Sequence, residues 1–159
     1  MKIKIICVGK LKEKYLKDAI SEYSKRLGRF CNLEITELAD EKIPDNPSAA
    51  EEEKVLLCEG EKILGKIGAT DYVITLCVEG KQLSSEEFAN KIHTLTLGGK
   101  SNITFIIGGS LGLHPDVKNR SDLRLGFSKM TFPHQLMRVV LLEQIYRAFK
   151  INANEKYHK

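Results

Sequence analysis

The stretch from Ile103 to Val117, ITFIIGGSLGLHPDV, combines an apolar run with a cluster of glycines, a pattern that can bind a phosphate or a nucleotide. The dinucleotide fingerprint G-x-G-x-x-G fails here, because counting from Gly108 places Ser110 and Leu113 where glycines are required. The P-loop pattern, whose second half matches a nearby GKS, fails because its first glycine would fall on a threonine. Gly108 and Gly109 can also simply turn the chain, since glycine tolerates positive φ. The motif by itself leaves a ligand site and a plain turn both open.

Two charged residues near the C-terminus, Glu143 and Arg147, lie four positions apart and would share one face of a helix. Such a pair can take part in proton transfer or anion binding, and it can equally be a structural ion pair. Two histidines are candidates for proton transfer because of their residue type. His134 follows Pro133 at a helix start, where histidine usually packs or caps, and His158 lies in a short terminal tail of the kind that is usually disordered. Spacing alone decides none of these roles.

The cysteines indicate neither a zinc site nor a redox pair. They are widely spaced and contain no C-x-x-C motif: Cys7, Cys31, Cys58 and Cys77. We interpret them as small buried hydrophobic residues and expect no bound metal.

Length and composition indicate one domain of ordinary size, residues 1–159, with 42% hydrophobic residues. The longest apolar runs fall far short of the ~20 residues of a membrane span. The opening stretch also lacks the separate apolar region of a signal peptide. We therefore expect a cytoplasmic protein that does not enter a membrane.

Hydrophobic periodicity predicts alternating strands and helices. Strands are expected at residues 2–8, 33–38, 72–78 and 102–107, with a weak strand at about 123–130. Helices are expected at residues 11–27 and 48–66, from Ser84 onward, near 115–119, and from Pro133 onward. Ser48 with Glu51 and Ser84 with Glu87 have the spacing of capping boxes. This alternation predicts an α/β fold with a mostly parallel sheet and helices on both faces.

In such a sheet, ligands bind beyond the carboxyl ends of the strands. Three loops would lie there: Glu79 to Lys81, the glycine-rich segment, and residues 126–135, GFSKMTFPHQ. Because all three would meet at one edge of the sheet, the sequence predicts a small-molecule site at that edge.

Charge is distributed unevenly along the chain, although the net charge is only +4. Residues 1–30 carry nine basic and three acidic side chains, and residues 118–159 carry the same numbers. Residues 31–80 carry four basic and twelve acidic side chains. If the two ends meet in the fold, they would form a positive face suited to a polyanion. Solvated helix faces can produce similar runs, so charge alone leaves nucleic-acid binding open.

The last helix is apolar on nearly every side between Leu136 and Phe149, which predicts that it is buried all round. A chain of this size can rarely surround a terminal helix by itself. We therefore expect a homodimer in which this helix forms the interface.

Four segments, in the expected order, resemble the RlmH family of SPOUT-class methyltransferases, which modify pseudouridine in large-subunit ribosomal RNA. They are KIKIICVGKLKEKY, FIIGGSLGLHPDV, LGFSKMTFPHQLMRVVLLEQIYRAFKI and the terminal YHK. The resemblance covers essentially the whole chain. It implies an α/β domain with a deep trefoil knot near the C-terminus, a homodimer, and S-adenosylmethionine bound in the knot. The acceptor it implies is N3 of a pseudouridine in helix 69 of 23S ribosomal RNA, within the ribosome.

The resemblance also implies site residues. Those expected to hold the methyl donor, mainly through the backbone, are Leu76, Gly108, Gly109, Phe127, Ser128, Lys129, Met130, Thr131 and Phe132. Those expected to serve catalysis are His134, Glu143, Arg147, Tyr157, His158 and Lys159. In this interpretation, the glycines give the cofactor room, and the terminal YHK closes over the site of the partner chain.

Two other functions remain open at this stage. The basic ends would suffice for an RNA-binding module without catalysis. A knotted methyltransferase acting on another RNA, such as transfer RNA, would show the same charge and motifs.

Overall fold

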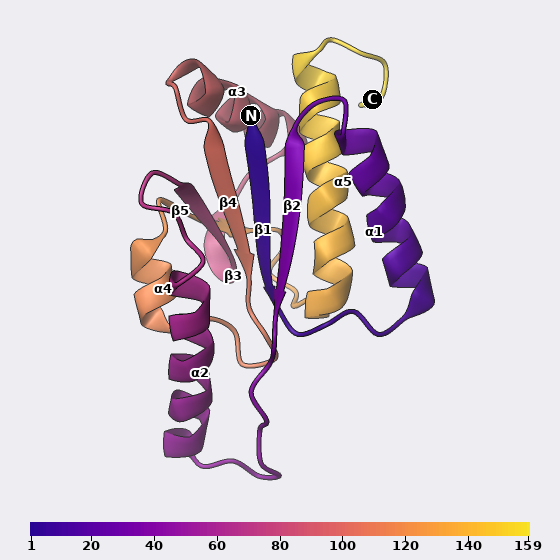
Figure 1. Ribbon diagram of the computed structural model, residues 1–159. Helices are drawn as coiled ribbons and strands as arrows, with labels where there is room; N and C mark the ends of the chain where they lie inside the picture. Colours follow the sequence, from indigo (N-terminus) through magenta and orange to yellow (C-terminus); the bar gives the residue numbers. More distant parts are fainter.

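The computed structural model describes residues 1–159, which form a five-stranded sheet and five helices (Figure 1). In chain order the elements are β1 (Lys2–Val8), α1 (Lys14–Leu27), β2 (Asn32–Leu38), α2 (Ala49–Leu64), β3 (Tyr72–Gln82), α3 (Ser85–Leu97), β4 (Asn102–Ile107), α4 (Pro115–Arg120), β5 (Leu123–Gly126) and α5 (His134–Asn152). The strand order is β2-β1-β4-β3-β5, and every neighbouring pair is parallel. The predicted α/β fold with a parallel sheet is confirmed.

The sheet is covered on both faces, as the sequence predicted. Alternate residues of β1 point to opposite sides: Ile5 belongs to a large apolar cluster that includes residues of α1, α3 and α5. Ile6 belongs to a smaller cluster with residues of α2 and α4. The two-residue period of a strand thus places three helices on one face and two on the other.

Two predicted capping boxes begin α2 and α3. The hydroxyl of Ser48 accepts from the backbone N–H of Glu51, whose side chain in turn accepts from the N–H of Ser48, and Ser84 and Glu87 do the same. These bonds satisfy N–H groups that have no partner inside the helix.

Three boundaries differ from the predictions. α1 begins at Lys14 rather than residue 11, because the Leu11 N–H donates to the carboxylate of Glu37 and the Lys12 N–H to the amide oxygen of Gln135. α2 ends at Leu64, where Gly65 caps it, two residues before the predicted end. β5 ends at Gly126, so residues 127–130 belong to the following loop rather than to the strand.

The fourth difference concerns the predicted loop at Glu79 to Lys81, which lies inside β3. The β3–β5 pairing shifts here: Leu76 and Lys81 both pair with Leu125, so the residues between them bulge out of the ladder. A Cβ on Gly80 would stand 2.5 Å from the backbone carbon of Leu125, which explains why glycine occupies the bulge.

The helix α5 buries one stripe in the single chain: Arg138, Leu141, Leu142, Ile145 and Ala148. Its face at Leu136, Val139 and Val140 lies outside both apolar clusters, and Leu136 is 39% exposed. The burial all round that the sequence predicted is therefore not reached within one chain. The homodimer stays a prediction, and so does the knot.

The two basic ends of the chain lie together in the fold, as a shared positive face requires. α1 packs against α5 through aromatic rings: Tyr146 lies 6.4 Å from Tyr23 and 6.0 Å from Phe30, measured between ring centroids. Phe30 also stacks on Phe149 at 5.5 Å. Figure 1 shows α1 and α5 side by side on one flank of the sheet.

Candidate functional site

A pocket of about 300 Å³ opens at the carboxyl edge of β3, β4 and β5. Its walls come from three segments: the β3 bulge, the loop after β4, and the loop between β5 and α5. The lining residues are Leu76, Cys77, Val78, Glu79, Ile107, Gly108, Gly109, Leu111, Gly112, Leu113, Lys118, Leu125, Phe127, Ser128, Met130, Thr131, Phe132, His134 and Met137. The volume lies in the range of small-molecule sites. The expected convergence of three segments at this edge is confirmed, although the first of them is a bulged strand.

The glycine-rich segment folds back on itself beside this pocket. Gly109 and Gly112 form an isolated antiparallel bridge, and the Gly112 N–H donates to the Gly109 carbonyl at 3.0 Å. A Cβ on Gly108 would stand 2.4 Å from the carbonyl oxygen of Gly112, which is closer than real contacts allow. A Cβ on Gly109 would stand 3.2 Å from Val8. The structure thus supports the plain-turn alternative for Gly108, which lets the loop close on its own backbone, whereas Gly109 lets the loop approach the side chain of Val8.

The charged side chains of the pocket are few. Glu79 and Lys118 form an ion pair, and this pair holds the pKa of Glu79 below its usual value. His134 lines the opposite side, at the start of α5. Burial, and secondarily the nearby Arg138, lowers the pKa of His134, so its ring is neutral at pH 7.

Arg138 anchors the start of α5 to the sheet. Its guanidinium is buried, donating to the Gly9 carbonyl at 2.7 Å and to the Glu37 carboxylate at 2.8 Å. These bonds tie the first turns of α5 to the carboxyl ends of β1 and β2. His134, one turn earlier, is thereby held at the pocket wall.

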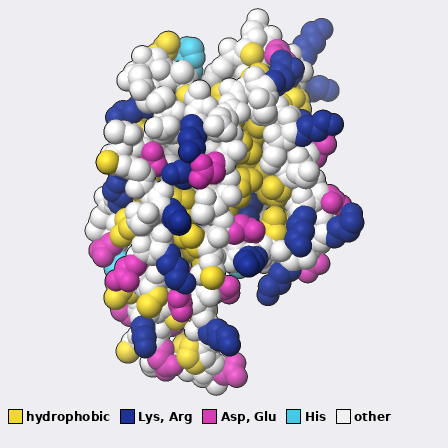
Figure 2. Space-filling model, in the orientation of Figure 1, with side chains coloured by type: hydrophobic (Ala, Val, Ile, Leu, Met, Phe, Trp, Pro, Cys, Tyr) yellow, Lys and Arg dark blue, Asp and Glu magenta, His cyan; other side chains and the backbone are white.

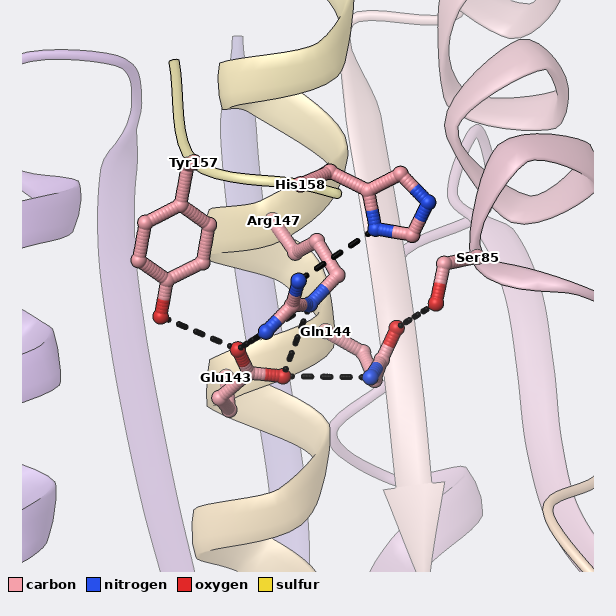
Figure 3. A network of polar contacts seen from close by, with 6 residues as sticks. All are labelled: Ser85, Glu143, Gln144, Arg147, Tyr157 and His158. Carbon is pink, nitrogen blue, oxygen red and sulfur yellow. Dashed lines mark hydrogen bonds and ion pairs between the residues drawn. The ribbon is translucent and has the colours of Figure 1, made fainter.

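A second polar cluster lies toward the other end of α5 (Figure 3). The Glu143 carboxylate accepts from the Arg147 Nη2 at 2.6 Å and from the Tyr157 hydroxyl at 3.0 Å. Gln144 donates to the same carboxylate at 3.1 Å and accepts from the Ser85 hydroxyl at 2.8 Å. Because Glu143 accepts from three side chains, its carboxylate is well placed to orient them and poorly placed to take a proton itself.

The terminal tail is ordered against this cluster. Arg147 Nη1 lies 3.3 Å from His158 Nδ1, and His158 Nε2 lies 2.7 Å from a carboxylate oxygen of Glu86. Since a guanidinium can only donate, Nδ1 is the acceptor, and the Nε2–H donates to Glu86. Burial, followed by the hydrogen bond to Glu143, raises the pKa of Tyr157 to about 12, so its phenol stays protonated. Lys159 is exposed at the chain end.

The tail residues lie outside the pocket of their own chain. Met137 lines the pocket; the tail cluster begins six positions later on α5, at Glu143, a rise of roughly 9 Å, and extends to Arg147, a rise of roughly 15 Å. Gln144 and Ser85 border a smaller cavity together with the pocket residues Leu125 and Phe127. Figure 1 shows the C-terminus beside the amino ends of the strands, whereas the pocket lies at their carboxyl ends. Neither Tyr157 nor His158 lines the pocket of its own chain.

The candidate residues thus divide into two groups. Eight of the nine expected cofactor residues line the pocket, and Lys129 is the one that does not. Of the expected catalytic residues, His134 joins this group, whereas Glu143, Arg147, Tyr157 and His158 form the tail cluster.

Sequence reasoning missed several members of both groups. It placed Glu79 at this edge but not Lys118, because the two meet only where the chain crosses from β4 through α4 to β5, and no local pattern marks the pair. Ser85 and Glu86, at the start of α3, join the tail cluster for a similar reason: α3 and α5 pack side by side. A correct strand order would have been needed to find them.

The prediction that the cysteines are buried is confirmed only for Cys7 and Cys31. Burial raises the pKa of each of these two thiols to about 11. Cys58 and Cys77 are half-buried, and Cys77 lines the pocket. No group of three or more metal-binding side chains comes together in the structure. None of the helices is both long and apolar enough to cross a membrane.

Comparison with known families and proteins agrees with the fold. Residues 1–158 match the family described as "Predicted SPOUT methyltransferase". Proteins named ribosomal RNA large subunit methyltransferase H match over the whole of both chains. They include those of Clostridium novyi (64% identical), Bifidobacterium adolescentis (62%) and Streptococcus thermophilus (60%).

One solved structure, a probable methylase family protein from Haemophilus influenzae, is similar with a TM-score of 0.57. The match covers 99% of this chain and 70% of that one, at 15% identity. At that identity, the likeness concerns the fold alone.

Proposed function

Because the chain belongs to the SPOUT methyltransferase family, we propose that it methylates ribosomal RNA of the large subunit in the cytoplasm, with S-adenosylmethionine as methyl donor. The observation that carries this proposal is the full-length identity of 60–64% to proteins named for that activity. The acceptor we propose is N3 of a pseudouridine in helix 69 of 23S ribosomal RNA.

The pocket fits an adenosyl group. It is walled mainly by apolar side chains, and the residues between Leu76 and Lys81 on β3 have no partner in register on β5. Backbone N–H and C=O groups at such a bulge are available to the edge of an adenine ring. We assign Leu76, Gly108 and the segment Phe127–Phe132 to this binding. Bound S-adenosylmethionine would supply a methyl group on a positively charged sulfur, which needs no metal to make it electrophilic.

The acceptor nitrogen carries an imide proton, which must leave before or during transfer. The chain can assist through a base or through cations that stabilise the resulting anion. Glu143, Arg147, Tyr157 and His158 form one bonded cluster suited to both tasks. In it, Arg147 supplies a fixed positive charge and Glu143 orients that charge, while His158 can accept a proton only after its Nδ1 leaves the Arg147 guanidinium.

A homodimer would bring this cluster to a pocket. The open face of α5 begins with Leu136, Val139 and Val140 near the pocket and continues to Glu143, which belongs to the tail cluster. If two chains pair along this face in antiparallel fashion, two-fold symmetry sets the tail end of each α5 beside the pocket end of the other. We therefore propose that each active site combines the pocket of one chain with the tail cluster of its partner.

The basic ends provide the surface for RNA. Figure 2 shows Lys and Arg side chains along the flank that Figure 1 assigns to α1. On α1, Lys14 and Arg26 pair with acidic neighbours, but Lys17 and Lys25, as well as the preceding Lys12, are exposed and form no ion pair. These free lysines are suited to contact phosphates, a contact that releases counterions from the RNA.

We expect the activity to fall steeply with added salt at subsaturating RNA. Replacing Lys12 and Lys17 together by glutamine should raise the KM for ribosomes. It should also make the slope of log(kcat/KM) against log salt concentration less steep, by roughly one unit for each phosphate that the variant no longer binds. Binding of S-adenosylmethionine should not change. The matched control is Lys54→Gln on α2, an exposed lysine without an ion pair on the other sheet face. A salt dependence unaffected by the double substitution would contradict this RNA face.

The proposed function is tested by methylation of ribosomes from cells that lack the gene. Radiolabelled S-adenosylmethionine reports transfer, and mass spectrometry of nuclease fragments locates the methylated nucleotide. The expected result is one methyl group on a pseudouridine of helix 69. Methylation confined to transfer RNA would refute the proposed substrate, and absence of binding to S-adenosylmethionine would refute the proposed activity.

A further inference from the structure

We propose that the Glu79–Lys118 ion pair recognises the amino-acid end of the methyl donor, with Lys118 binding its carboxylate and Glu79 its ammonium group. The inference rests on the proposed function and adds to it two specificity residues outside the backbone contacts named above.

Charge in the pocket is confined to one place. Among the lining residues, Glu79 and Lys118 carry the charges, while His134 is neutral at pH 7 because its pKa is lowered. The other polar side chains, Ser128 and Thr131, carry none. A largely apolar pocket with one ion pair matches a ligand whose adenosine is neutral and whose amino-acid end is a zwitterion.

The position of the pair also suits this role. Glu79 stands on the β3 bulge, and Lys118 on α4, so both lie on the side of the pocket away from α5. His134 and Met137 supply the α5 side. An amino-acid end held at α4 leaves the α5 side of the pocket to the acceptor base, next to the helix that carries Glu143 and Arg147.

The chain fixes the Lys118 side of the pair more than the Glu79 side. The Lys118 side chain is 25% exposed and that of Glu79 55%, and the Lys118 backbone carbonyl accepts from the Ser121 hydroxyl at 2.6 Å and from Arg124 at 3.4 Å. The hydrogen bond from Lys118, reinforced by the charge of Arg124, lowers the pKa of Glu79 and keeps it ionised. Two oriented opposite charges can therefore face an α-carboxylate and an α-ammonium at little further ordering cost.

The test compares two ligands by calorimetry with the full-length protein. S-adenosylhomocysteine contains the amino-acid end, and 5′-methylthioadenosine lacks it. Replacing Lys118 by glutamine is expected to raise the Kd of S-adenosylhomocysteine about tenfold, which corresponds to roughly 1.4 kcal/mol of binding free energy. The Kd of 5′-methylthioadenosine should not change. Glu79→Gln should act in the same direction. An equal loss for both ligands would overturn the proposal, because it would indicate a disturbed pocket.

An exchange of the two charges separates recognition from a merely structural ion pair. In the double variant Glu79→Lys with Lys118→Glu, the pair can still form, but each charge faces the wrong group of the ligand. We expect this variant to bind S-adenosylhomocysteine about tenfold more weakly than the wild type, or more weakly still, and to bind 5′-methylthioadenosine as the wild type does. Restored affinity would contradict the proposal. If the wild type bound neither ligand, the proposed function itself would fail, which is a distinct outcome.

Discussion

A protein that lacks Tyr157, His158 and Lys159 is expected to bind S-adenosylmethionine and to dimerise as the wild type does, yet to transfer methyl groups at least roughly 10²-fold more slowly. The reason is the division of the site. Deletion removes two members of the tail cluster but touches neither the pocket nor the open face of α5.

Single-turnover methylation of ribosomes measures this effect without interference from product release. Calorimetry with S-adenosylhomocysteine and sedimentation provide the two controls. The variant His158→Ala should show a loss of roughly 10²–10⁴-fold if its ring accepts the proton. A small loss in His158→Ala, together with a large one on deletion, would assign the main effect to anion stabilisation beside Arg147. Full activity of the truncated protein would contradict a role for the tail.

The substitution Gly108→Val is expected to abolish binding of S-adenosylmethionine. Its Cβ would stand 2.4 Å from the carbonyl oxygen of Gly112, so the loop that walls the pocket must open. The dimer should persist, since the open face of α5 is untouched. Calorimetry measures the binding, and sedimentation measures the assembly.

The control for Gly108→Val is Gly99→Ala. Gly99 has a φ of +78°, so a side chain there is strained, but nothing lies within 4 Å of its Cβ position. It precedes β4, at the opposite edge of the sheet from the pocket. We expect this control to bind the cofactor normally despite some loss of stability. Normal cofactor affinity in Gly108→Val would refute the account of the loop.

The sequence was a good guide to the fold where short-range signals act. The capping boxes at Ser48 and Ser84 place the starts of two helices, and the apolar runs place four strands. It failed at Gly80, which looked like a loop residue. There the glycine permits close contact between two strands that are distant in sequence, and such contacts leave no local pattern.

The candidate site was predictable in composition but not in arrangement. The loops at Gly108 and Phe127 meet as parallel strand topology requires. The separation of His134 from Arg147 was implicit in the length of one helix, yet only the contacts of the tail with α3 and α5 show that Tyr157 and His158 lie outside the pocket of their own chain. The structure adds a second reason for glycine at position 108, because the nearest obstacle to its Cβ is the chain itself; the cofactor contact stays a prediction.

In the proposed dimer, each active site combines the pocket of one chain with the tail of its partner, and mixed dimers distinguish this arrangement from two self-contained sites. One dimer pairs a Gly108→Val chain with a chain that lacks residues 157–159. A second dimer pairs a wild-type chain with a chain that carries both changes. Separate affinity tags on the two chains allow each mixed dimer to be purified.

Single-turnover methylation by the two mixed dimers then gives opposite answers for the two arrangements. In the first dimer, the intact tail belongs to one chain and the intact pocket to the other, so we expect one working site and about half of the wild-type activity. In the second, the only intact pocket faces a truncated partner, so we expect almost no activity. An inactive first dimer with a half-active second one would contradict the shared site and would show that each chain uses its own tail.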